Sequence, residues 1–312
     1  MKHESKHIAL KRENYDYSTI EQSILINEHS SSFDMCKGLI YMFISCIFKS
    51  MYSIIYKLEF QKIPQLSSYQ LLTYVAFFSY LISLIIVACL YYTSHSYLVT
   101  NNKKEDIIYI SIRSVIALLA VSLLTNSLQS ANISDVFTVY YIYPAIVIVI
   151  SYLFLKEKVG KFDIYCFLAS FVGVIFVIRP SIMFNNGKDN KDIVLYMMVI
   201  LSACMKAVAD VIIRDVGKQV NCFVNALIYS FFSLLIHPLQ MLYTNSKFID
   251  LEAWDIFIAF IIAVCYIVSH VFVILGIQNE NVGRVSMINY TQIPIMFILD
   301  ITFFGKKLIF YD

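Results

Sequence analysis

Nine long apolar segments alternate with shorter polar ones between residues 38 and 304. Each segment holds roughly twenty residues, enough for a helix rising about 1.5 Å per residue to cross a hydrocarbon layer about 30 Å thick. The run Leu81–Leu90 lacks the two-residue alternation of a membrane barrel strand. The pattern predicts an all-α polytopic membrane protein with spanning helices at residues 38–56, 69–93, 107–127, 134–155, 162–179, 192–213, 222–244, 254–277 and 283–304.

Composition supports this class and excludes others. Hydrophobic residues make up 59% of the chain and charged residues 15%, with a mean hydropathy of +0.70. The net charge of +2 is small and spread along the chain, so we expect no nucleic-acid partner. The seven cysteines lie mostly inside apolar runs and form no CxxC pair. We therefore expect no disulfide, metal or cofactor.

The first 36 residues contain four Lys or Arg and six Asp or Glu with little apolar periodicity, so they are expected to form a disordered tail. No cleavable signal precedes the first apolar segment, which is long enough to remain as a spanning helix. Placing the amino terminus in the cytoplasm puts thirteen basic residues inside and eight outside. This bias predicts a multi-pass protein with a cytoplasmic amino terminus, in a membrane that the sequence does not identify.

Two segments carry a lysine at matching positions within apolar sequence. Lys49 and Lys206 are 157 residues apart, and Ser45 and Ser202 match at the same offset. Lysines are rare at mid-membrane because each costs about 2.5 to 3.5 kcal/mol on insertion scales. The first and sixth helices are therefore predicted to be repeats of each other.

The fourth and ninth segments also match. Tyr140 and Pro144 correspond to Tyr290 and Pro294 at an offset of 150. A repeat of five helices is odd, so its second copy must enter the membrane from the opposite side. The pattern thus predicts an inverted repeat of five-helix units, an arrangement typical of transporters.

Two stretches resemble a known family. Leu155-Lys156-Glu157-Lys158-Val159, followed by residues 171–180, resembles the end of the first repeat of EamA-type drug/metabolite transporters. Residues 283–294 and Phe303-Phe304-Gly305 resemble the second repeat, most nearly in the G group of solute carrier family 35. The resemblance implies ten helices in two inverted repeats, here residues 37–180 and 191–312, and carriage of small metabolites.

The chain departs from this family pattern at its end. Gly305-Lys306 stands where the family usually has Gly-Glu, and Asp312 comes before any tenth helix. Nine spanning helices are therefore expected, with the family's tenth missing. Glu157 matches a glutamate characteristic of the family; otherwise it is an exposed charge at a helix end.

Lys49 and Lys206 are the leading candidates for binding a solute. Two ammonium groups at mid-depth favour a wet cavity that receives a carboxylate or phosphate ester. Alternatively, Asp210, one helical turn after Lys206, only forms an ion pair with it. Lys49 has Ser53 at the corresponding place.

Pro144 and Pro294 each remove an amide donor from the middle of a predicted helix. Matched helix breaks often mark a transporter's binding site. The further binding candidates are nearby polar side chains that would be costly to bury against lipid: Tyr140, Tyr141, Asn289, Tyr290 and Gln292. The alternative is a proline kink that only shapes helix packing.

Four other ionisable residues lie within apolar segments. Arg113 is expected to extend to the cytoplasmic headgroups, since it lies six residues into its predicted helix. Asp210, His270 and Asp300 are candidates for proton coupling, because intramembrane ionisable groups often form relays. An interhelical hydrogen bond is the alternative for His270.

The sequence therefore predicts a multi-pass transporter of a small organic, anionic metabolite that works by alternating access. The alternative is a non-transporting membrane adaptor or regulator with a degenerate transporter fold. No GxSxG or HExxH motif is present, so no catalytic residue and no enzyme activity are predicted. The expected partners are a small-molecule solute and the lipid bilayer, and a homodimer is left open.

Overall fold

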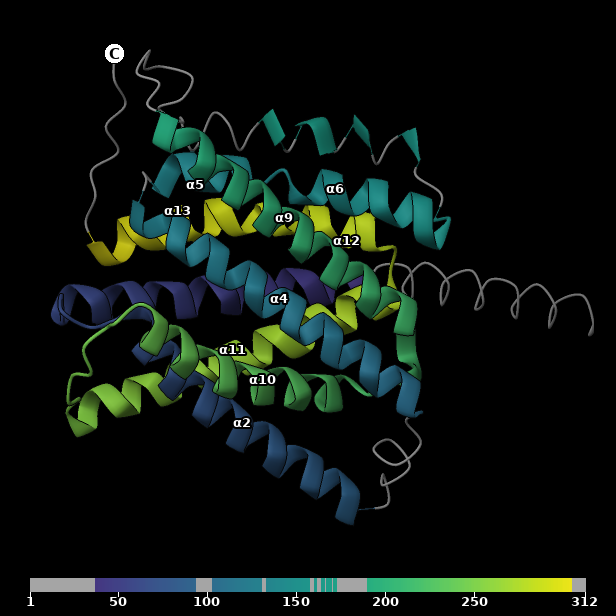
Figure 1. The fold of residues 1–312 in the computed structure, drawn as a ribbon. Helices are drawn as coiled ribbons and strands as arrows, with labels where there is room; N and C mark the ends of the chain where they lie inside the picture. Colours follow the sequence, from purple (N-terminus) through teal and green to yellow (C-terminus); the bar gives the residue numbers. More distant parts are fainter. Residues whose placement is uncertain are drawn as a thin grey trace, which may run out of the picture.

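The protein is a bundle of helices (Figure 1). The structure, a computed structural model, describes residues 37–93, 103–130, 133–157, 160, 161, 164, 165, 167–169, 171, 172 and 190–304. All regular elements in these ranges are helical. The tail of residues 1–36, most of the predicted helix at 162–179, and residues 305–312 with Lys306 lie outside the described part.

Among the described residues, six helices are long and apolar enough to cross a membrane. They are the first helix (Lys37–Lys62), α2 (Ser68–Tyr92), α4 (Lys104–Ser130), α9 (Asn190–Val216), α10 (Cys222–Tyr243) and α11 (Ala253–Asn279). Each matches a span predicted from the sequence. The largest boundary error is at the first helix, which continues to Lys62 instead of ending at residue 56. The prediction of a multi-pass α-helical membrane protein is confirmed.

The predicted fourth and ninth spans are not continuous α-helices. The fourth consists of α5 (Ile133–Tyr140), α6 (Tyr143–Ile150) and a π-helical turn, η1 (Ser151–Leu155). The ninth consists of α12 (Val282–Ile288), a 3₁₀ turn, η3 (Asn289–Thr291), and α13 (Gln292–Phe304). Pro144 and Pro294 lie in the first turns of α6 and α13. A proline is tolerated there because first-turn amides have no partner within the helix.

Contacts between helices define two ends of the bundle. Lys62 forms an ion pair with Asp255 in the first turn of α11, and we call this the Lys62 end. At the opposite, Lys37 end, the backbones of Gly38 and Gly276 meet, since a Cβ added to Gly276 would lie 3.1 Å from the carbonyl oxygen of Gly38. The first helix and α11 are therefore antiparallel neighbours along their length. Small residues such as glycine permit this approach.

The largest buried cluster joins the first helix with α6, α9, α11 and α12. Around it, α4 packs against α9, and α10 packs against α2 and α4. The outer surface is apolar, with exposed side chains such as Ile85, Tyr92 and Leu242 that face lipid in a membrane protein. Trp254, the single tryptophan of the chain, is exposed in the first turn of α11 at the Lys62 end.

Candidate functional site

The two interrupted helices face each other at their breaks. The Tyr290 hydroxyl, in η3, donates a hydrogen bond of 2.8 Å to the carbonyl oxygen of Tyr141, which lies between α5 and α6. The two rings are 5.9 Å apart. A carbonyl released from the helical ladder is thus satisfied by a side chain from the other break. Tyr290, one of the residues matched in the sequence, therefore lies beside Tyr141, the residue that follows Tyr140.

The side-chain amides of Asn289 and Gln292 contact nearby atoms of the ninth predicted helix. The Asn289 amide donates to the Ser286 carbonyl at 3.3 Å, and the Gln292 amide lies 3.6 Å from the Met296 sulfur. Both side chains are buried. They therefore fix the local geometry of the second break in this conformation.

Lys206 is held by two neighbours. It forms an ion pair with Asp210, which is fully buried one helical turn away on α9. Its ammonium also lies 5.7 Å from the ring centroid of Tyr143, which in turn packs 5.6 Å from the ring of Tyr140. The ion pair weighed as the alternative for Lys206 is therefore present.

Lys49 differs from Lys206, with which it was matched in the sequence. Within the described part of the chain, no carboxylate lies within ion-pair distance of its ammonium group. The Ser53 hydroxyl does not face that ammonium, because it donates to the Lys49 carbonyl at 2.7 Å. Lys49 lies within electrostatic range of Lys206. The two matched cations therefore share one region.

Arg113 is the main correction to the sequence analysis. We expected it to reach the headgroups, but it is buried, with only 2% of its surface exposed. Its Nη1 donates to the Asn225 side-chain oxygen at 3.5 Å, and its guanidinium lies 5.3 Å from the ring centroid of Tyr229. Arg113 faces α10 because a helix interface supplies polar and aromatic partners that lipid lacks.

The charges of the ionisable side chains around Lys206 do not balance. Lys206 lies within electrostatic range of Lys49, Arg113 and Asp210. Three cations against one carboxylate leave two positive charges in excess among these described residues. In a medium of low dielectric constant, such an excess of positive charge favours the binding of an anion.

Of the remaining proton-coupling candidates, His270 lies beside this group. Its ring is 4.4 Å from that of Tyr229 and 6.1 Å from that of Tyr266. No interhelical hydrogen bond to its Nε2 is made by the described residues. Asp300 belongs to α13, but its side chain lies outside the described part.

A cavity of about 330 Å³ opens between the first helix, α2, α4, α10 and α11. It is lined by Tyr52, Ser53, Tyr56, Phe60, Ser68, Leu72, Val75, Ala76, Val121, Thr125, Tyr229, Ser233, His237 and Tyr266. None of the seven predicted binding residues is in this lining. The sequence analysis missed these aromatic residues, although two groups recur at four-residue spacing on one helix face: Tyr52, Tyr56 and Phe60, and Tyr229, Ser233 and His237.

The cavity runs from mid-depth toward the Lys62 end. Tyr52 and Tyr229 lie in the middle of the bundle, whereas Phe60 and Ser68 lie where the first helix ends and α2 begins. The compartment therefore reaches from the middle of the bundle to the Lys62 end.

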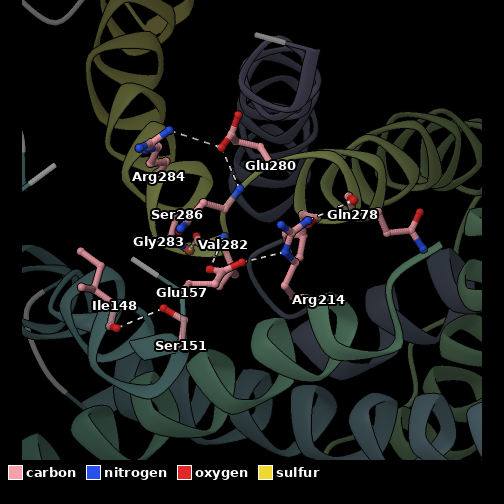
Figure 2. A network of polar contacts seen from close by, with 12 residues as sticks. Ile148, Ser151, Glu157, Arg214, Gln278, Glu280, Val282, Gly283, Arg284 and Ser286 are labelled. Atoms are coloured by element: carbon pink, nitrogen blue, oxygen red, sulfur yellow. Dashed lines mark hydrogen bonds and ion pairs between the residues drawn. The ribbon is translucent and has the colours of Figure 1, made fainter. Parts of the chain in front are cut away.

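A polar network joins helices at the Lys37 end (Figure 2). The Glu157 carboxylate accepts from Arg214 Nε at 2.8 Å and from the Val282 amide at 3.2 Å. Arg214 Nη1 donates to the carbonyls of Ile277 and Gln278 at 3.2 and 3.1 Å. The network thus ties together η1, α9, α11 and α12. Glu157 is therefore more than an exposed charge.

Local structure places each member of this network. Glu157 follows Lys156, which ends η1 in the left-handed conformation at φ 54°. Arg214 lies in the last turn of α9, and its carbonyl partners form the last turn of α11. A cation near the end of a helix satisfies carbonyls that have no amide partner within it. The described residues contain no cluster of three or more His, Cys, Asp or Glu able to hold a metal ion.

Comparison with known proteins agrees with this architecture. The chain is 25% identical to a probable transport protein of Saccharomyces cerevisiae over 63% of its own length and 60% of the relative. It is 23% identical to solute carrier family 35 member G1 of Mus musculus and 21% identical to that of Homo sapiens, over 72% of this chain and 61% and 62% of those relatives. The chain thus spans about three fifths of the length of these relatives.

The fold is also found in a solved structure. A crystal structure matches 86% of this chain and 89% of its own with a TM-score of 0.69 at 12% identity. The family described as the EamA-like transporter family matches residues 36–179 and 193–312, which cover most of the sequence. The chain therefore belongs to the EamA-like transporter family.

Proposed function

We propose that the protein carries a small organic anion across a membrane by alternating access, using two inverted five-helix repeats. The meeting of the two breaks carries this proposal, because Tyr290 from the ninth predicted helix bonds to Tyr141 from the fourth. In transporters built from inverted repeats, broken helices meet at the binding site near mid-membrane. Family membership supports the same activity.

The excess of cations supports an anionic solute. Lys49 and Arg113 have no carboxylate within ion-pair distance in the described part of the chain, and the single nearby carboxylate, Asp210, pairs with Lys206. A carboxylate or phosphate would offset their repulsion. Tyr140 and Tyr143 add aromatic surface beside Lys206.

The two ends of the bundle support alternation. The cavity extends toward the Lys62 end, while Glu157 and Arg214 join helices at the Lys37 end. If the amino terminus is in the cytoplasm, the Lys62 end and the cavity that extends toward it lie on the opposite side of the membrane. Transport requires this network to break while the cavity closes at the Lys62 end, where Lys62 and Asp255 already form an ion pair.

Counterflow in proteoliposomes tests the proposal. Vesicles loaded with a panel of small carboxylates and phosphate esters are expected to accumulate the matching labelled anion. Removing the charges of Lys49 and the ion pair together, as K49M with K206M and D210N, should abolish uptake, whereas Lys247→Met, an exposed lysine in the loop after α10, should leave it intact. Unchanged uptake in the triple variant would remove the anion site from the proposal.

A further inference from the structure

The faces that line the cavity continue beyond it toward the Lys37 end. Residues four apart share one helix face. On α10, Tyr229, Ser233 and His237 line the cavity, and Asn225 is the next residue of this series. On α11, the residue four beyond Tyr266 is His270.

The same extension applies to α4 and to the first helix. Val121 and Thr125 line the cavity, and the series continues through Ala117 to Arg113. Ser53 lines it from the first helix, and the series continues to Lys49. Four helices thus place a polar or charged side chain on the Lys37 side of an aromatic compartment.

Three nitrogens of this group lack a protein partner. Arg113 Nε, Asn225 Nδ2 and His270 Nε2 are buried and accept or donate no hydrogen bond among the described residues. Arg113 is 2% exposed and Asn225 is fully buried. An unsatisfied buried donor costs about 1 to 3 kcal/mol, so three in one place need an explanation.

Tyr229 connects these nitrogens to the compartment. Its ring lines the cavity, contacts the Arg113 guanidinium at 5.3 Å and lies 4.4 Å from the His270 ring. The Asn225 side-chain oxygen faces Arg113, which leaves the amide nitrogen of Asn225 to donate elsewhere. Arg113 Nε and Asn225 Nδ2 can only donate, and His270 Nε2 donates in the tautomer that carries the proton there, so the group suits an acceptor-rich anion.

We propose that Arg113, Asn225 and His270 form a subsite for the carboxylate or phosphate of the solute, and that the aromatic cavity holds its apolar body. The proposal rests on the proposed function and narrows the solute to a small amphipathic anion. A volume of about 330 Å³ is at the lower limit of ligand pockets, which suits a body of about one ring. Arginine matches both anions because its planar fork can form paired hydrogen bonds.

Binding by the purified full-length chain in lipid nanodiscs tests the subsite. The probes are benzoate, phenyl phosphate and benzamide, which is similar in shape to benzoate but neutral. Calorimetry should show benzoate or phenyl phosphate binding at least about tenfold more tightly than benzamide, since hydrogen bonds to charged groups contribute more than neutral ones. The two anions show whether the site prefers a carboxylate or a phosphate. Equal binding of all three probes, or binding of none, overturns the proposal.

Asn225→Asp separates binding from a structural role of Arg113. The new carboxylate would lie where the Asn225 oxygen meets Arg113 and would occupy the subsite from within. Anion affinity should fall at least about tenfold while the thermal midpoint stays equal or rises, because a buried cation gains a partner. The control is Asn245→Asp, which adds the same charge at an exposed left-handed position in the loop after α10. Unchanged anion affinity in Asn225→Asp would show that Arg113 serves only the fold.

The subsite and the transport activity can fail separately. Benzoate binding that survives Asn225→Asp, together with anion counterflow by wild type, overturns the subsite and leaves transport standing. Loss of binding in that variant, with no uptake of any anion by wild type, supports the subsite and overturns transport.

Discussion

Asp210 has no surface exposure and its ion-pair partner Lys206 is one helical turn away. Breaking a buried pair costs about 3 to 5 kcal/mol because one charge is left without its partner. We therefore expect Asp210→Asn to lower stability by about 3 kcal/mol. Thermal unfolding in detergent would show this as a lower midpoint.

The matched control is K206M with D210N, which removes both charges while keeping similar volumes. It should recover most of the lost stability, since replacing a buried pair by uncharged groups is often neutral. If Asp210→Asn alone unfolds like wild type, the pair contributes nothing to the fold.

The sequence was enough to predict the ion pair between Lys206 and Asp210, but it did not predict which residues surround Arg113. A lysine and an aspartate four positions apart on one helix must lie close, whatever the fold. Arg113 lies on α4, whose apolar residues surround the helix without a preferred face. Such a helix gives no sign of which side meets lipid and which meets α10. The contacts with Asn225 and Tyr229 therefore required the structure.

At the scale of elements, the network of Glu157 and Arg214 joins segments from the two predicted repeats (Figure 2). We expect Arg214→Gln to weaken closure of the Lys37 end, because it removes the ion pair with Glu157. Cys46, fully buried on the first helix beside the Ile288 carbonyl, reports this opening. In a chain with the other six cysteines replaced, a small maleimide should label Cys46 several-fold faster in the variant.

Arg284→Gln is the control for Arg214→Gln. Arg284 also pairs with a glutamate at this end, at 3.6 Å from Glu280, but its side chain is 42% exposed. Exposed pairs contribute about 0 to 1 kcal/mol, so labelling should change little. Equal rates in the two variants would show that the Glu157 contact does not hold this end closed.

The contact between the first helix and α11 makes a second prediction for elements. A Cβ on Gly38 would lie 2.3 Å from the Glu280 Cβ, whereas one on Gly276 would meet the Gly38 carbonyl oxygen at 3.1 Å. Gly38→Ala should therefore destabilise more than Gly276→Ala, by about 1 to 3 kcal/mol as in other overpacked interfaces. Thermal midpoints of the two variants check the order. A reversed order would mean that the helices separate easily at this point.

Hydropathy was sufficient for the six long helices because their length and apolar composition together decide whether they span a membrane. It treated the fourth and ninth segments as equally continuous, although the prolines marked their midpoints. Pro144 and Pro294 lie in first helical turns because the chain before each of them leaves the α-helix. It does so at Tyr141 in the fourth segment and at Asn289 in the ninth. The hydrogen bond from Tyr290 to Tyr141 supports those turns, and it joins residues 149 positions apart. No local pattern contains such a contact.

For the whole molecule, the helix directions predict which loops share a side of the membrane. Lys103 precedes α4 at the Lys37 end, and Lys247 follows α10 at the Lys62 end. In sealed vesicles of known sidedness, Lys103→Cys should label with an impermeant maleimide from the cytoplasmic face and Lys247→Cys from the other face. The excess of basic residues on the Lys37 side supports this direction. Labelling of both from one face would contradict the topology.

Trp254 gives this chain a built-in optical probe. Its indole is exposed beside Asp255, whose carboxylate pairs with Lys62, and its ring lies 5.6 Å from that of Phe257. Because the sequence has no second tryptophan, all indole emission comes from this one position. A shift in emission wavelength on adding a solute would therefore report a change at the Lys62 end directly, without any introduced dye.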